Sequence, residues 1–277
     1  TVRACAAIAR QEGCTFVVGL GGGSSIDTAK AVAAMATNDG DWWDYIYGGS
    51  GKRQKLKNQP LPIVAITTTA GTGTEADPWT VITNGEEKIG GGSDKTFPAI
   101  SIVDPDFMMS VPPHLTAYQG FDALFHACEG YLSQSANPIS EMYSLAAIEL
   151  VGRSLARAVA DGADAGARAD MALANTLAGF VESLSSLTAE HAIEHAMSGF
   201  HPNLPHGAGL ILISLEYYKF VADTYPDKFT RMAQALGRAD GDFIAALADL
   251  QRQCHVDALK MSDFGMTGDD FGKYADH

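Results

Sequence analysis

The sequence predicts an α/β region over residues 1–105, followed by an all-helical region over residues 106–277. Before Asp104 and Pro105, short apolar runs of strand length alternate with glycine-rich turns. After them, long stretches repeat apolar residues at the spacing of one helix face. The length of 277 residues suits one large domain or two ordinary ones. We therefore place a domain boundary near residue 105.

The first elements predict a helix, a strand and an anion-binding turn. Residues 1–12 are helical in pattern, and Gly13 ends them. Because the chain opens inside a helix and without Met, we expect it to belong to a longer polypeptide. Residues 15–20 (TFVVGL) predict a buried parallel strand. The following GGGSSIDTAK, residues 21–30, begins a helix whose free N–H groups and dipole suit a phosphate, although a plain tight turn is the alternative.

The rest of the α/β region repeats this pattern of short strands and turns. Residues 39–58 are polar and glycine-rich and predict a loop. Residues 61–66 predict a second strand, which leads into TTTAGTGTE at 67–75. Small hydroxyl groups after a strand suit a ribose or a pyrophosphate, but such turns are also ordinary loops. Residues 80–83 predict a strand, EEKIG a turn, and residues 99–103 a further strand.

The helical region contains seven predicted helices. Apolar periodicity places them near 114–132, 138–159, 164–186, 188–198, 207–222, 226–236 and 240–253.

Composition and charge exclude several classes of protein. The chain has 19 basic and 33 acidic residues, a net charge of −14, which argues against nucleic acid or an anionic membrane as a partner. Its four cysteines are widely spaced and form no CxxC motif, as expected of reduced thiols in a cytoplasmic protein. No apolar run is long enough to span a bilayer.

Four of the eight histidines lie in HAIEHAMSGFHPNLPH, residues 191–206. His191 and His195 are four residues apart and share a helix face, and after the break at Pro202 and Pro205 the chain supplies His206. Neutral imidazoles in this pattern suit a divalent metal. Core or interface histidines are an equally good interpretation of this stretch alone.

A second pair, Asp122 and His126, is set in apolar helical sequence, GFDALFHACEGY. A carboxylate and an imidazole are costly to bury unless they are paired or bind a ligand. A simple Asp–His hydrogen bond in the core is the alternative. Taken together with the other histidines, the pair favours a site for Fe²⁺ or Zn²⁺ with a position left for substrate or water.

These motifs, in this order and spacing, resemble the iron-containing (group III) alcohol dehydrogenases: GGGSSIDTAK, TTAGTGTE, SIVDP, GFDALFHACEGY and HAIEHAMSGFHPNLPHG. The resemblance covers nearly the whole chain. It implies a Rossmann-like α/β nucleotide-binding domain, incomplete at its start, and an all-α metal-binding domain. The missing first βαβ unit would hold the residue that chooses between NAD and NADP.

The resemblance also implies roles for individual residues. The metal ligands would be Asp122, His126, His191 and His206, with Fe²⁺ as the metal and Zn²⁺ as the alternative. His195 would lie near the nicotinamide and the substrate and act in proton transfer or orientation, not as a metal ligand. The nucleotide would contact the turn and its neighbours, namely Gly21, Gly22, Gly23, Ser24, Asp27, Thr68, Thr72 and Lys88.

The expected activity is NAD(P)-linked oxidation of a small alcohol to its aldehyde or ketone, with a homodimer as the usual assembly of this family. Two alternatives remain: a glycerol dehydrogenase or dehydroquinate-synthase-like enzyme of the same superfamily, or a non-catalytic metal- or nucleotide-binding relative.

Overall fold

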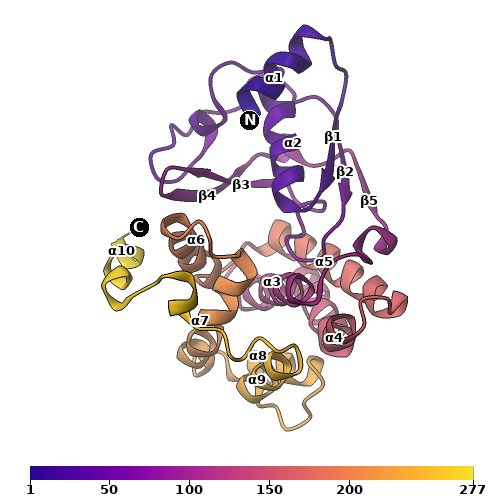
Figure 1. Ribbon diagram of the computed structural model, residues 1–277, viewed down its shortest axis with the longest axis vertical. Helices are drawn as coiled ribbons and strands as arrows, with labels where there is room; N and C mark the ends of the chain where they lie inside the picture. The colour runs from indigo at the N-terminus through magenta and orange to yellow at the C-terminus, as the bar shows by residue number, and fades with distance from the viewer. Residues whose placement is uncertain (277) are drawn as a thin grey trace.

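The computed structural model describes residues 1–276 and confirms an α/β region followed by an all-helical one (Figure 1). The α/β elements lie at one end of the molecule, with the N-terminus, and the helices α3 to α9 lie at the other. Among the described residues, none of the helices is long and apolar enough to cross a membrane.

Three parallel strands form the main sheet, in the order β1-β2-β5. They are β1 (Val17–Gly21), β2 (Ile63–Thr67) and β5 (Ile100–Val103). The helices α1 (Val2–Gln11) and α2 (Gly23–Met35) pack on each other through small and apolar side chains. Gly19 of β1 lets α2 approach the sheet, because a Cβ there would lie 2.9 Å from that of Ala29. The carboxyl ends of these strands carry the glycine turn and the threonine-rich loop to the same edge.

A separate antiparallel hairpin corrects one prediction. The EEKIG segment is not a turn, because Glu87–Gly92 forms β4 and pairs with β3 (Trp79–Asn84). The turn comes earlier, at Gly85 and Glu86, where Gly85 has a φ of +66° that suits a two-residue hairpin loop. The glycines of β4 hid the strand, since glycine is depleted in strands. Gly91 packs closely against Ile46, because a Cβ there would lie 2.3 Å from the Cδ1 atom of that side chain, which would have to move.

The helical region follows the predicted pattern to within a few residues. Its helices are α3 (Pro113–Leu132), α4 (Pro138–Ala160), α5 (Ala165–Ser185), α6 (Glu190–Phe200), α7 (His206–Ala222), α8 (Pro226–Ala235), α9 (Phe243–Gln253) and α10 (Phe271–Asp276). Short 3-10 turns that the periodicity did not indicate occur at Trp42–Tyr45, Asp94–Thr96, Pro105–Met108, Met261–Phe264 and Gly268–Asp270.

Helix α3 is the centre of the helical region. Every residue from Gly120 to Leu132 is buried, and α4, α5 and α7 pack around it. Asp122 and His126 are therefore held inside the protein on a rigid helix, where polar groups need partners.

Candidate metal centre and cofactor cleft

A cleft of about 220 Å³ lies where the two regions meet, and it joins most of the predicted site residues. The α/β region contributes the start of α2, the threonine-rich loop and the hairpin β3–β4. The helical region contributes α3, α5, α6 and α7. The lining of the cleft includes Gly23, Ser24, Asp27, Thr72, Lys88, His126, His191, His195 and His206. Residues from opposite ends of the sequence therefore share one cavity.

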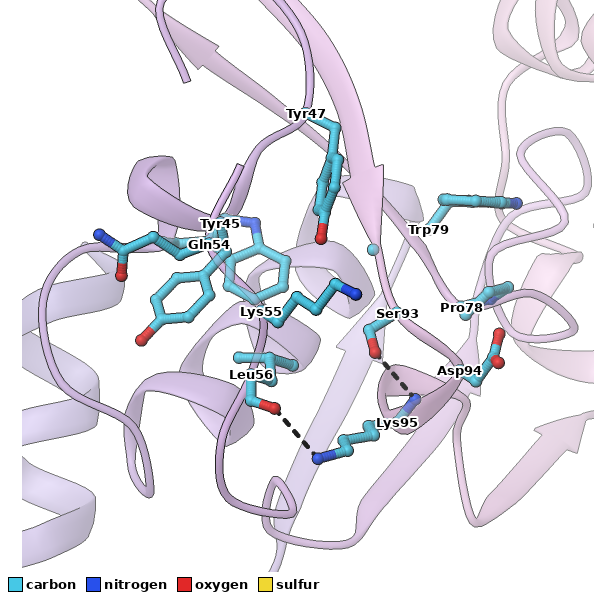
Figure 2. A pocket seen from close by; sticks show the side chains of 12 residues that line it. Tyr45, Tyr47, Gln54, Lys55, Leu56, Pro78, Trp79, Ser93, Asp94 and Lys95 are labelled. Atoms are coloured by element: carbon cyan, nitrogen blue, oxygen red, sulfur yellow. Dashed lines mark hydrogen bonds between the residues drawn. The ribbon is translucent and has the colours of Figure 1, made fainter. Parts of the chain in front are cut away.

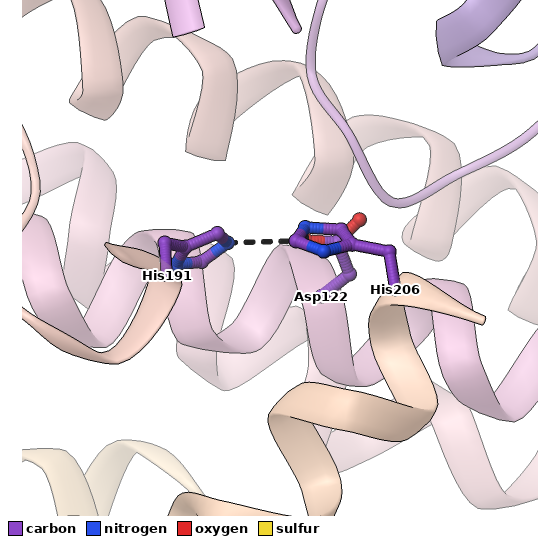
Figure 3. A group of neighbouring side chains, drawn as sticks. All are labelled: Asp122, His191 and His206. Carbon is purple, nitrogen blue, oxygen red and sulfur yellow. Dashed lines mark hydrogen bonds and ion pairs between the residues drawn. The ribbon is translucent and has the colours of Figure 1, made fainter. Parts of the chain in front are cut away.

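Three predicted metal ligands lie close together (Figure 3), and two of them, His191 and His206, line this cleft. Asp122 comes from α3, His191 from α6, and His206 is the first residue of α7, one residue earlier than the predicted helix start. The Oδ1 atom of Asp122 lies 3.3 Å from Nε2 of His191 and 3.6 Å from Nε2 of His206. Their donor atoms all lie within 4.8 Å of one another, as befits residues that share a metal ion.

The fourth predicted ligand, His126, lies beside this group. Its ring centroid is 4.0 Å from that of His191, and its Nδ1 atom is 2.9 Å from the backbone oxygen of Asp122. If Nδ1 carries the proton and donates it there, Nε2 keeps its lone pair. Nε2 lies 3.8 Å from a carboxylate oxygen of Glu182, which also lines the cleft. The ring thus lies beside His191, but among the described residues His126 does not belong to the group of Asp122, His191 and His206, whose donor atoms all lie within 4.8 Å of one another.

Glu129 contacts both the backbone and the ring of His191, a role that was not anticipated from the sequence. This carboxylate is fully buried on α3 and accepts the backbone N–H groups of Glu190 and His191 at 3.1 Å. It also contacts Nδ1 of the His191 ring, which leaves Nε2 directed at Asp122. Spacing alone gives a signal, because Asp122, His126 and Glu129 are at i, i+4 and i+7 on one helix face.

A second carboxylate, Glu194 of α6, stands in the same relation to His206. It contacts Nδ1 of that ring, and its Oε2 atom lies 3.2 Å from Nζ of Lys88 in β4. Lys88 also donates to the hydroxyl of Ser198 at 2.8 Å. The structure thus places Lys88, a residue predicted to meet the cofactor, in the cleft and in contact with His206, a predicted metal ligand.

The positive charges beside the buried carboxylates of this group hold them in the ionised form. Burial raises the pKa of Asp122, but the neighbouring His126 and His206 outweigh it and hold that pKa well below its usual value. Burial likewise raises the pKa of Glu194, yet His206 and Lys88 bring it down to about 2. For His191, burial lowers the pKa, but Glu129 and Asp122 raise it well above the ordinary value. Buried carboxylates that stay ionised need positive charge, and the donor set of one carboxylate and three imidazoles fits Fe²⁺ or Zn²⁺.

His195 differs from its neighbours. Burial, His206 and Lys88 together hold its pKa well below the ordinary value, so the ring stays neutral. Its ring centroid lies 5.3 Å from that of His206 and 6.4 Å from that of His191. Within the described residues, its buried Nε2 atom has no hydrogen-bond partner. A neutral imidazole with a free polar atom beside the metal ligands can bind or relay a proton.

The glycine turn is shaped by close packing as well as by its free N–H groups. A Cβ at Gly22 would lie 3.0 Å from Thr69, and one at Gly23 would lie 2.7 Å from Thr72. Gly21 has a φ of +143°, which other residues rarely adopt. Gly22 caps α2 without a side-chain hydrogen bond, so the first N–H groups of α2 have no acceptor within the helix. This edge has the features of a phosphate site.

Two predicted cofactor residues are already engaged by the protein. Thr68 donates its backbone N–H to Gly21 at 3.0 Å and does not line the cleft. Asp27 does line it, but its carboxylate accepts the Thr74 hydroxyl at 2.6 Å and the Val81 N–H at 2.8 Å. Asp27 therefore ties α2 to the threonine-rich loop and to the hairpin.

A buried lysine that was not predicted strengthens that junction. Lys30 is fully buried one turn after Asp27, and its Nζ atom lies 2.6 Å from the Thr74 hydroxyl and 3.0 Å from Oδ1 of Asp77. It also donates to the backbone oxygen of Trp79 at 2.7 Å. This cation fixes the wall of the cleft against α2.

Other features lie outside the metal group. A cavity of about 360 Å³ on the α/β region is lined by aromatic residues and lysines, including Tyr45, Trp79 and Lys95, and by no histidine (Figure 2). Its Lys95 is bonded to the backbone oxygen of Leu56 at 3.1 Å. His201, between the motif histidines, packs against Tyr274 of α10 and does not line the cleft.

Two family models match this chain. Residues 1–105 match the family model described as iron-containing alcohol dehydrogenase, and residues 116–277 match that of the C-terminal part of the Fe-containing alcohol dehydrogenase family. A choline dehydrogenase of Bacillus subtilis is 40% identical over 230 residues, 82% of this chain and 56% of that protein. Alcohol dehydrogenase 4 of Saccharomyces cerevisiae is 36% identical over 277 residues, 98% of this chain and 71% of that protein.

A solved structure extends the likeness to three dimensions. Sulfoacetaldehyde reductase from Bifidobacterium kashiwanohense, in complex with NAD⁺, superimposes with a TM-score of 0.88 at 32% identity and covers 99% of this chain and 72% of its own. The chain thus spans between about half and three quarters of the length of these relatives. By sequence, fold and family models, the chain belongs to the iron-containing alcohol dehydrogenase family.

Proposed function

We propose that this chain is the catalytic part of a metal-dependent, NAD(P)-linked alcohol dehydrogenase, which interconverts an alcohol and its aldehyde or ketone. The observation that carries the proposal is the cleft itself, where the start of α2 lines the same cavity as His191 and His206, the two histidines grouped with Asp122. Hydride transfer needs a dinucleotide and an activated substrate oxygen side by side. The relatives named above are oxidoreductases, and one of them holds NAD⁺.

Asp122, His126, His191 and His206 would hold the metal, with Fe²⁺ as the first choice and Zn²⁺ as the second. When bound, such an ion supplies Lewis acidity that polarises the substrate oxygen. The protein's contribution is to keep these donors rigid. Each comes from a helix, and the carboxylates of Glu129 and Glu194 stand behind two of the rings.

The other residues of the cleft bind the cofactor and move the proton. Gly22, Gly23 and Ser24 at the start of α2 would receive the pyrophosphate through backbone N–H groups. The neutral ring of His195 would accept the alcohol proton or pass it outward, since its buried Nε2 atom is free. The hairpin β3–β4 contributes Trp79, Val81, Thr83 and Lys88 to the lining of the cleft.

Metal content and turnover test the proposal together. Protein purified without oxygen is analysed for iron and zinc and assayed for alcohol oxidation with NAD and with NADP. We expect close to stoichiometric metal and turnover in the wild type, and the loss of both in His206→Ala. His201→Ala removes a histidine outside the cleft and serves as the matched control, with metal and turnover retained. Bound metal without turnover on either cofactor would contradict the enzymatic proposal, and a metal-free wild type would contradict the site.

A further inference from the structure

Glu194 is a fully buried carboxylate whose surroundings are built to hold it in one position. It packs against Gly209 of α7, where a Cβ would lie 2.8 Å from the Cγ atom of Glu194. On its other side, Lys88 reaches from β4 to within 3.2 Å of Oε2. The side chain therefore has little freedom to leave the His206 ring, which its Oε2 atom contacts at Nδ1.

We propose that Glu194 is a positioning residue that orients the imidazole of His206 for metal binding, and that Lys88 links this orientation to the hairpin of the α/β region. The proposal rests on the metal site of the proposed function. Oε2 of Glu194 is the carboxylate oxygen in contact with Nδ1 of His206, and a metal-binding histidine commonly donates its other ring N–H to such a carboxylate. Nε2 then keeps its lone pair, and Nε2 is the atom directed at Asp122, 3.6 Å away. Glu194 thus selects the tautomer and the ring orientation that the metal requires.

The position of Lys88 explains why the carboxylate of Glu194, although it lies beside His206, is not expected to bind the metal itself. Glu194, His195 and His206 could also gather around an ion, because their donor atoms lie within 4.8 Å of one another. The ammonium group of Lys88 already lies 3.2 Å from the carboxylate and 3.3 Å from Nδ1 of His206. A dication in the same place would be repelled by this fixed charge. The metal is therefore expected on the Asp122 side of the His206 ring.

The test measures metal affinity in the absence of alcohol and cofactor. The metal-free chain is titrated with Co²⁺ against a chromophoric chelator, and the Co²⁺ absorption spectrum is recorded. We expect Glu194→Ala to bind Co²⁺ about 10- to 100-fold more weakly than the wild type, with an altered spectrum, because the His206 ring is no longer held. Glu194→Gln should recover part of this loss, since its amide oxygen still accepts the Nδ1 hydrogen.

Ser198→Ala is the matched control. Ser198 lies on the same helix, one turn from Glu194, and bonds Lys88 without contacting an imidazole that binds the metal. Its substitution should leave Co²⁺ affinity unchanged. Circular dichroism of each metal-free variant shows whether it folds.

Two results would overturn the proposal. One is wild-type affinity and spectrum in Glu194→Ala, or in Glu194→Gln should the alanine variant not fold. The other is complete loss of binding in both variants while Asp122→Asn still binds, which would make Glu194 a ligand. A wild type that binds Co²⁺ but oxidises no alcohol with its native metal contradicts the proposed function and leaves the role of Glu194 standing.

Discussion

Substitution of Gly179 by alanine probes the contact that joins the threonine-rich loop to helix α5. A Cβ at position 179 would lie 2.3 Å from the backbone oxygen of Gly73 and 3.0 Å from the Cβ atom of Ala76. Gly73 itself has a φ of +63°, and its N–H donates to the side chain of Asn175 at 2.8 Å. The carbonyl belongs to a turn tied to α5, so it cannot rotate away as a flexible side chain would.

The expected change in the free energy of unfolding is the cost of the steric clash minus the gain from replacing glycine by alanine in a helix. Forcing an extra methyl group into a packed contact costs about 1–3 kcal/mol, and the short distance to a backbone atom places this case at the upper end. Alanine in the middle of a helix returns about 1 kcal/mol relative to glycine. The net loss is about 2 kcal/mol, which lowers Tm by about 4–8 °C in a chain of this size.

Thermal unfolding of the metal-free protein, followed by circular dichroism, measures this shift. Gly166→Ala is the matched control in the same helix, because the nearest atoms to its added Cβ are 3.4 and 3.9 Å away, an ordinary distance. We expect no loss of stability there. If Gly179→Ala unfolds at the wild-type temperature or above it, then the loop and α5 are not in tight contact, and the reasoning is refuted.

Two further predictions concern the buried charges beside α2. Lys30→Met leaves the carboxylates of Asp27 and Asp77 buried without their cation, so it should lower the free energy of unfolding in urea by about 3–5 kcal/mol. Lys55→Met, on the exposed loop, should cost little. Equal losses in the two variants would contradict this role of Lys30. Burial, partly offset by Lys30, raises the pKa of Asp77 to about 7 from 3.8, so the folded state holds this proton more tightly. Its stabilising contribution is therefore full below about pH 4 and is lost as the pH rises to about 7, by at most about 1.4 kcal/mol per pH unit. Urea unfolding of Asp77→Asn and wild type between pH 5 and 7 checks the sign, and a steeper fall in the variant would refute it.

Much of the fold could be predicted because its signals are local. Helices α3 to α9 repeat their apolar residues at helical spacing, and β1 and β2 are short apolar runs between turns. The hairpin strand β4 was missed because its residues KIGGG are poor strand formers. Its pairing with β3 and its packing against Ile46 stabilise it despite that composition.

The candidate metal site also has a part that sequence spacing predicts and a part that only the folded structure brings together. Asp122 and His126, or His191 and His195, can be recognised as pairs from their spacing on one helix face. Nothing local relates Lys88 to Glu194, which lie 106 positions apart, or Lys30 to Asp77. Such pairs exist only because the two regions fold against each other.

The sequence by itself determined the order of the elements, the candidate metal-binding residues and the family, since all of these depend on residue identity and short-range spacing. Only the tertiary structure decided how the donors are used. It placed Asp27 where its carboxylate bonds Thr74 of the threonine-rich loop. It also brought Glu129 into contact with the imidazole of His191, and Glu194 into contact with that of His206. The physical reason is burial: a charged group inside the protein must find a partner in space, and that partner is chosen by packing rather than by position in the chain.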